Sequence, residues 1–142
     1  MRLRPATPQD APACAAILTA FVAETPWMPA LHSPATNLAY VEGLIEAPDI
    51  EVIVAEDQSG FAALQGTLVW QLQVAAAARR RGLGSQLIAA LKDRTDHLAL
   101  WCFVANRPAR AFYEKQGFVE TARTGGENEE GLPDIRLEWR RG

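Results

Sequence analysis

The chain has 142 residues, of which 49% are hydrophobic, so it is long enough for one domain with a sizeable core and short for two. Its 14 Lys and Arg against 17 Asp and Glu give a formal net charge of -3, too mild to indicate general binding to nucleic acid or an anionic membrane. No stretch approaches the roughly 18 apolar residues of a membrane span, and the first residues lack a signal-peptide core. We therefore expect a soluble, cytoplasmic protein without a metal or disulfide framework, since it has only Cys14 and Cys102.

The first half of the sequence predicts a strand, two helices and three further strands. After a short strand over residues 2–7, Thr7 is a helix cap and Pro8 occupies the first helical position. Residues 25–34 contain three prolines and are expected to form a loop, and a second helix should then run until Pro48. Alternating apolar and β-branched residues predict strands over residues 51–56, 61–64 and 67–74.

The second half predicts helices and strands in alternation. Helices are expected over residues 83–94 and 107–116, a buried strand over 97–104, and two last strands over 118–122 and 135–139. No repeat or linker interrupts this order. The sequence therefore predicts one α/β domain over residues 1–142, with a mixed sheet flanked by helices.

The strand that ends at Val74 leads through a basic, glycine-containing loop directly into a helix. Such a helix start presents unpaired backbone N–H groups and the positive end of its dipole, which together favour an anion. Gly82 and Gly84 allow the backbone to approach a ligand closely. The alternative is a solvated loop, in which the three arginines face water and the glycines only turn the chain. The segment matches neither the dinucleotide fingerprint nor the Walker phosphate loop.

Two segments resemble motifs of one family. Arg79-x-x-Gly82-x-Gly84 resembles the pyrophosphate motif of the GNAT superfamily of acetyl-CoA-dependent N-acetyltransferases, and residues 106–118 resemble its later motif, with Asn, Ala, aromatic-Tyr-Glu-Lys and Gly-Phe in register. The resemblance covers essentially the whole chain. It implies a GNAT fold, with a mostly antiparallel sheet of about six to seven strands and about four helices, and acetyl-CoA as the cofactor.

The resemblance also implies roles for individual residues. In that family the strand that ends at Val74 splays away from its neighbour, and the pantetheine arm of the cofactor lies in the gap. The residues that would contact the cofactor are Leu72, Val74, Ala76, Arg79, Arg80, Arg81, Gly82, Leu83, Gly84, Ser85, Asn106 and Tyr113. Asn106 has the alternative role of a helix cap. Tyr113 matches the general acid that protonates the departing thiolate, and its alternative role is packing beside Phe112.

The general base stays open. Some family members carry a glutamate in the central strand, but residues 68–73 contain no carboxylate here. The base is then a water chain, a residue elsewhere such as His32, or no specific group if the amine arrives neutral.

Two loops contain candidate acceptor-binding residues. Trp27, Met28 and Leu31, together with Trp70 on the central strand, form either the apolar wall of an acceptor pocket or a roof over the core. In the fold that the resemblance implies, the link over residues 125–134 lies near the acceptor entrance, where the charge of Glu129 and Glu130 can attract a cationic amine. The alternative for this link is a solvated hairpin.

These observations favour an N-acetyltransferase that moves the acetyl group of acetyl-CoA to a primary amine of a small molecule, by direct attack in a ternary complex. One alternative is a protein or peptide N-terminal acetyltransferase. Another is a non-catalytic acyl-CoA-binding module, which the missing strand carboxylate motivates. We expect neither a nucleic-acid nor a membrane partner, and the resemblance leaves a homodimer open.

Overall fold

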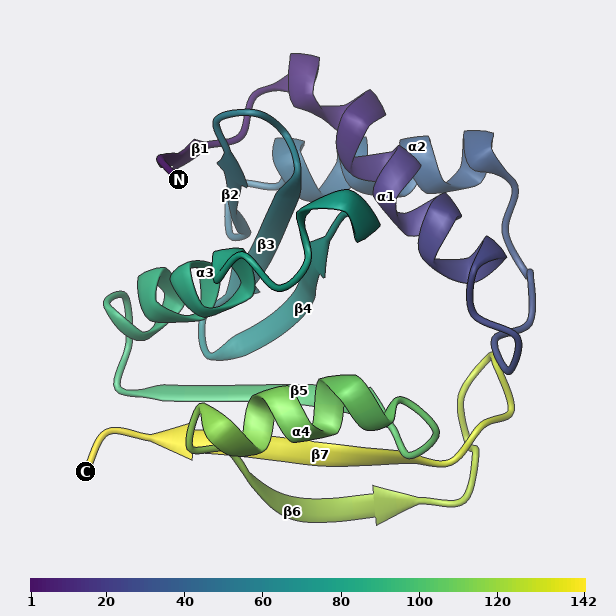
Figure 1. The fold of residues 1–142 in the computed structure, drawn as a ribbon, viewed down its shortest axis with the longest axis vertical. Coiled ribbons are helices and arrows are strands. Elements are labelled where there is room, and N and C mark those ends of the chain that lie inside the picture. The colour runs from purple at the N-terminus through teal and green to yellow at the C-terminus, as the bar shows by residue number, and fades with distance from the viewer.

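The computed structural model describes all 142 residues and joins seven strands into one mixed sheet (Figure 1). The strand order is β1-β2-β3-β4-β5-β7-β6. The strands are β1 (Leu3–Pro5), β2 (Glu51–Ala55), β3 (Gly60–Gln65), β4 (Leu68–Val74), β5 (His97–Phe103), β6 (Val119–Thr124) and β7 (Asp134–Arg140). Four α helices flank them: α1 (Ala11–Ala23), α2 (Pro34–Glu46), α3 (Leu83–Lys92) and α4 (Arg107–Lys115). The predicted α/β fold with six to seven strands and about four helices is confirmed. None of the helices has the length and apolar character needed to cross a membrane.

The element boundaries follow local sequence signals. The Ser33 hydroxyl accepts the N–H of Thr36 at 3.1 Å at the start of α2, and the helix ends just before the Ala47-Pro48 pair. The start of α1 differs from the prediction, because residues 8–10 form a 3-10 turn and the α helix itself begins at Ala11. A second short 3-10 turn, Ala76–Ala78, was not predicted.

Helices cover both faces of the sheet (Figure 1). On one face α1 and α2 bury Cys14, Ile17 and Val41 against Val54 and Phe61. On the other face the core contains the inner sides of α3 and α4, and it includes Leu83, Leu87, Ile88, Leu91, Leu98, Leu100, Tyr113 and Phe118. In β2, successive residues therefore point to opposite layers, as the period of a strand requires.

Strands β4 and β5 barely pair. They run parallel and share a single register pair, Leu68 with Ala99, next to the hydrogen bond from the Ala99 N–H to the Thr67 carbonyl at 2.8 Å. By contrast, all seven residues of β5 pair with β7 on its other side. Beyond Leu68 the two strands diverge (Figure 1). The sheet therefore opens between its two central strands, at the end where β4 leads into α3.

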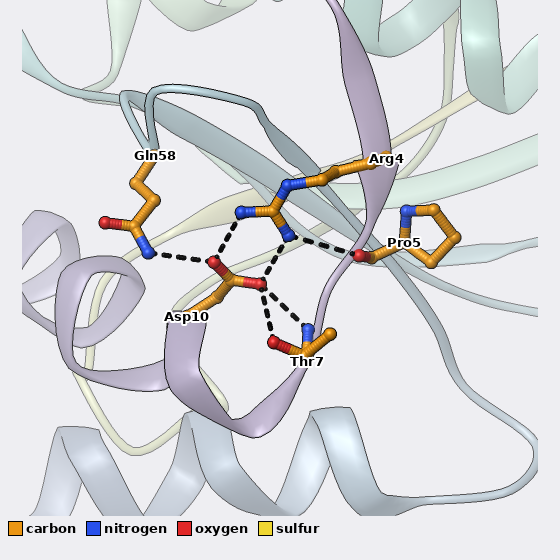
Figure 2. A network of polar contacts seen from close by, with 5 residues as sticks. All are labelled: Arg4, Pro5, Thr7, Asp10 and Gln58. Carbon is orange, nitrogen blue, oxygen red and sulfur yellow. Dashed lines mark hydrogen bonds and ion pairs between the residues drawn. The ribbon is translucent and has the colours of Figure 1, made fainter.

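A polar network fixes the N-terminal strand to the rest of the fold (Figure 2). Asp10 is only 1% exposed, and each of its carboxylate oxygens accepts a hydrogen bond from the Arg4 guanidinium at 2.8 Å. The Gln58 amide and the Thr7 N–H also donate to it, both at 2.8 Å. These bonds, that of Arg4 foremost, hold the pKa of Asp10 well below its usual range. The network joins β1, the start of α1 and the β2–β3 turn.

Candidate active site

Two cavities meet where β4 and β5 diverge. The first, of about 700 Å³, lies under the α1–α2 loop and the β6–β7 link, and is called the loop cavity here. The second, of about 980 Å³, includes Arg79, Arg80 and the start of α3, and is called the arginine cavity. The residues common to both linings define a junction: Phe21, Leu72, Gln73, Asn106, Ala109 and Tyr113. A molecule in one cavity can therefore reach a molecule in the other.

The arginine cavity is bounded by a run of free backbone donors. The N–H groups of residues 80–85 make no hydrogen bond within the protein. Those of residues 82–85 precede the first bond of α3, from the Gln86 N–H to the Gly82 carbonyl, and those of Arg80 and Arg81 lie in the loop before it. Arg80 and Gly82 have φ angles of 67° and 79°, which turn this backbone into a concave arc. Such an arc at the positive end of a helix dipole binds anions through the main chain. The donors present thus fit a pyrophosphate group.

Gly84 shows how closely the elements approach here. A Cβ at this position would lie 3.3 Å from the Phe112 ring of α4, tighter than ordinary van der Waals contact. Gly82 has open space around it, and its requirement for glycine comes from its positive φ. The two glycines therefore have different physical roles.

The arginines of the motif are not equivalent. Arg79 donates from Nε to the Val74 carbonyl at 3.2 Å and pairs through Nη2 with Glu24 at 2.5 Å. Arg80 lines the cavity, as do Leu83, Gly84 and Ser85, whereas Arg81 and Ala76 are exposed and lie outside both linings. The basic charge at this cavity therefore comes from Arg79, Arg80 and Lys115, and that of Arg79 is already paired with a carboxylate.

Tyr113 lies at the junction. Its side chain is 8% exposed, with edge-to-face contacts to Phe112 at 5.2 Å and Phe118 at 5.4 Å between ring centroids. The hydroxyl makes no hydrogen bond to a protein group, yet no unpaired polar atom is sealed in the core, so it faces accessible space. Burial, with a smaller effect of Cys102, raises the pKa of Tyr113 above its usual range. The hydroxyl therefore keeps its proton and has it available for a ligand.

The cysteines show no sign of nucleophilic activation. Burial raises the pKa of Cys102 to about 11 and that of Cys14 to about 12. Only Cys102 lines a cavity, and at neutral pH it is a neutral thiol.

A chain of neutral hydrogen bonds crosses the loop cavity. The Gln73 amide donates to the Gln71 carbonyl at 3.0 Å, and the Gln71 amide donates to the Tyr40 hydroxyl at 3.2 Å. No carboxylate is among the junction residues. The sequence analysis missed these three residues, although two glutamines two positions apart in a largely apolar strand indicate a polar stripe on one face.

The loop cavity contains most of the predicted acceptor residues. Its lining includes Met28, Leu31, His32, Trp70, Glu129 and Glu130. Trp27 instead lines the arginine cavity, where its ring stands edge-on to Phe21 and Phe103, at 6.4 and 5.9 Å between centroids. The structure thus places Trp27 apart from Trp70, while Met28 and Leu31 line the same cavity as Trp70.

The two loops above this cavity are tied together. His32 Nε2 lies 2.8 Å from Glu129 Oε1, which joins the α1–α2 loop to the β6–β7 link. Glu130 is half-buried and has no hydrogen-bond or ion-pair partner in the protein. The cavity mouth thus combines one engaged carboxylate with one free carboxylate.

Known proteins are similar to this chain in part of the sequence and in the fold. A family model described as Acetyltransferase (GNAT) domain matches residues 48–120, just over half of the chain. The peptidyl-lysine N-acetyltransferase YiaC of Escherichia coli (strain K12) is 35% identical over 83 residues, 56% of this chain and 55% of that protein, so the match spans about half of the relative's length.

Solved structures match over nearly the whole length. Apo YjaB from Escherichia coli gives a TM-score of 0.80 at 23% identity, covering 99% of this chain and 98% of that one. The yncA protein from Salmonella typhimurium, solved with its cofactor acetyl-CoA, gives 0.76 at 20% identity, with 100% and 94% covered. At these identities the likeness concerns the fold, and the family model supplies the assignment. The chain belongs to the GNAT family of acetyltransferases, whose members use acetyl-CoA.

Proposed function

We propose that the protein transfers the acetyl group of acetyl-CoA to a primary amine of a small molecule, by direct attack in a ternary complex. The observation that carries this proposal is the meeting of two differently lined cavities at Tyr113. One cavity presents donors for a pyrophosphate, and the other presents an apolar lining with carboxylates. An acyl donor and an amine that enter from opposite sides would meet at the junction.

The arginine cavity would hold acetyl-CoA. The N–H groups of residues 80–85 would take its pyrophosphate, with the charge of Arg79 and Arg80 added. The arm would follow the open edge of β4 past Leu72 and Val74, where β5 offers no pairing. Bound acetyl-CoA supplies the acetyl group as an activated thioester.

The residues of the chain then have separate tasks. The neutral Tyr113 hydroxyl would donate its proton to the thiolate that leaves. The Gln73 side-chain carbonyl would accept a hydrogen bond from the attacking amine and orient it. Because the junction holds no carboxylate, the amine would lose its own proton to water, and kcat/KM should rise about tenfold per pH unit below the pKa of the acceptor.

The direct test is turnover on a panel of amines with acetyl-CoA, followed by release of free thiol and by the mass of the product. Calorimetry with acetyl-CoA, run in parallel, separates an inactive protein from one that does not bind the cofactor. Binding without turnover on any amine or peptide would favour the non-catalytic acyl-CoA-binding module. A pH profile that levels off well below the acceptor pKa would reveal a protein base that the structure does not predict.

A second candidate is acetylation of lysine in a peptide. The similarity to a peptidyl-lysine N-acetyltransferase over 83 residues supports it. A lysine-containing peptide, and the same peptide with a free N-terminus and no lysine, belong in the panel for this reason. Faster turnover of the lysine peptide than of every small amine would replace the first candidate with this one.

A further inference from the structure

The lining of the loop cavity has negative charge but no permanent positive charge. Its 24 residues include Glu129 and Glu130 but neither lysine nor arginine, and its only imidazole, His32, is bonded to Glu129. Arg136, which stacks on Trp101 at 5.9 Å, lies outside the lining and pairs with Glu138 at 3.5 Å. A carboxylate or phosphate on the acceptor would lose hydration here without gaining a cationic partner.

Exposed aromatic side chains gather in the same cavity. The protein exposes six large hydrophobic side chains, and four of them line this cavity: Leu31 at 48%, Tyr40 at 38%, Trp70 at 47% and Trp101 at 45%. They come from a loop, a helix and two neighbouring strands, so only the folded chain brings them together. Such a cluster favours a ligand with an apolar body, because covering exposed apolar surface contributes about 25 cal/mol per Å².

The roof of the cavity favours a small ligand. Met28, Leu31 and His32 cover it from the α1–α2 loop, and the contact of His32 with Glu129 at 2.8 Å closes the side toward the β6–β7 link. A volume of about 700 Å³ falls within the range of small-molecule sites.

From these three observations we infer that the acceptor is a small primary amine on an apolar, preferentially aromatic, body that has no anionic group. This inference rests on the proposed function, because it names the substrate class of the same site. Free amino acids are then poor acceptors because of their carboxylate, and amines without an apolar body gain little from the exposed aromatic side chains. Glu130, which has no partner of its own, attracts the ammonium form of the amine toward the junction.

Three compounds with the same indole body test the charge rule. Tryptamine has no anionic group, L-tryptophan adds a carboxylate, and L-tryptophanamide adds nearly the same bulk without the charge. We expect kcat/KM for tryptamine and the amide to exceed that for tryptophan at least tenfold, with agmatine and kanamycin also below tryptamine. Equilibrium binding of the three compounds in the presence of coenzyme A gives a readout that does not depend on turnover.

Variants of the lining test whether the named residues cause the preference. Glu130→Arg should reduce the ratio of kcat/KM for tryptamine to kcat/KM for tryptophan by about fivefold or more, because it replaces the free carboxylate with a cation. Glu46→Arg makes the same change at an exposed glutamate at the end of α2, outside both cavities, and should leave the ratio unchanged. Trp101→Ala should reduce the advantage of tryptamine over ethylamine.

The outcomes separate this inference from the proposed function. Binding or turnover of tryptophan equal to that of tryptamine would overturn the inference and leave acetyl transfer intact. A clear binding preference for tryptamine without any turnover would overturn the proposed function alone. Faster turnover of a lysine peptide than of tryptamine would overturn the assignment to a small acceptor.

Discussion

The arginine cavity offers main-chain groups to its ligand, whereas the loop cavity offers side chains. At the start of α3, consecutive N–H groups are free, and glycines remove the side chains that would cover them. In the loop cavity, aromatic rings, amides and carboxylates converge from a loop, a helix and two strands. A main-chain site tolerates many changes of side chain but no change of backbone path. A side-chain site can change its ligand by single substitutions, as a family with one cofactor and many acceptors requires.

The largest effect should follow from a charge placed inside the main-chain site. In Gly84→Asp, a carboxylate would stand next to the free N–H groups and repel the phosphates. Like charges about 4 Å apart near a protein surface repel by about 4 kcal/mol, so even with screening the dissociation constant for acetyl-CoA should rise at least about 100-fold. Calorimetry on the folded variant measures this.

Two controls isolate the charge. Gly84→Ala introduces only the 3.3 Å contact with Phe112, and Gly43→Asp adds a carboxylate on α2 where nothing lies within 4 Å. Both should bind acetyl-CoA far better than Gly84→Asp. If Gly84→Asp folds and binds as tightly as Gly84→Ala, the anion site is not at α3.

Tyr113→Phe probes one of the six residues that line both cavities. The hydroxyl has no protein partner, so its removal should leave the fold and the affinity for acetyl-CoA nearly unchanged. General acid catalysis contributes about 10²- to 10⁴-fold, and a thiolate leaves fairly easily without help, so we expect kcat to fall about 100-fold. Single-turnover kinetics on the amine identified by the panel measures the loss.

The chain has one other tyrosine, which provides a matched control. Tyr40→Phe removes the acceptor of the Gln71 amide and should change mainly the KM of the amine. A loss of kcat below about threefold in Tyr113→Phe would leave protonation of the thiolate to water.

Asp10→Asn should alter neither cavity and only destabilise the fold. It weakens the bonds between the buried carboxylate and the part-exposed Arg4 guanidinium, which should lower the free energy of unfolding by about 1 to 3 kcal/mol. The pKa of Asp10 is lower in the folded chain than in the unfolded one. Its contribution is therefore complete above about pH 5 and declines as the pH falls through the ordinary aspartate range near 4.

Chemical denaturation of both forms between pH 3 and 7 measures this difference. In the variant, the free energy of unfolding should fall less steeply as the pH is lowered, because Asp10 no longer contributes. The dissociation constant for acetyl-CoA and the KM for the amine should stay the same. Asp93→Asn, at an exposed position without a partner, should leave stability unchanged. Equal stability of Asp10→Asn and the parent at pH 7 would contradict the role of the network.

The smallest effect concerns the competition for Arg79. In the structure Glu24 pairs with this arginine, so the pyrophosphate must compete with a carboxylate. Glu24→Gln should therefore tighten binding of acetyl-CoA by about 1.5- to 5-fold, the range of an exposed ion pair. Glu46→Gln is the control, and weaker binding in Glu24→Gln would mean that Glu24 helps to hold the cofactor.

The difference between the main-chain site and the side-chain site also explains how much of each the sequence predicts. The strands and helices follow from short-range patterns, such as Ser33-Pro34 before α2, and their predicted bounds agree to within a few residues. The main-chain donors of the arginine cavity come from one continuous segment, because a strand that enters a helix through glycines determines its own backbone. What local pattern does not determine is which residues of the motif line the cavity: Arg79 and Arg80 do, whereas Arg81 and Ala76 are exposed outside it.

The loop cavity was predicted less completely because its residues meet only through tertiary packing. Tyr40 and Trp101 are far apart in sequence, and neither has a local motif. Gln71 faces the cavity because the β3–β4 register shifts between Ala63 and Leu64, which leaves Trp70 without a partner. The sequence alone does not separate Trp27 from Met28, its neighbour in the chain, although Trp27 packs between α1 and the end of β5.

Because β4 and β5 share a single register pair, we expect that the chain can be cut between the two halves of the sheet. Residues before and after the α3–β5 turn form two parts, each with its own paired strands, and the backbone links them through little more than the Ala99 to Thr67 hydrogen bond. The shared core around Leu98 and Leu100 and side-chain hydrogen bonds, such as those from Lys92 to the Gln116 carbonyl and between His32 and Glu129, make the remaining contacts. We expect that a chain cut near Thr95 would give two fragments capable of complementation, and that acetyl-CoA, which would contact both, would promote their reassembly.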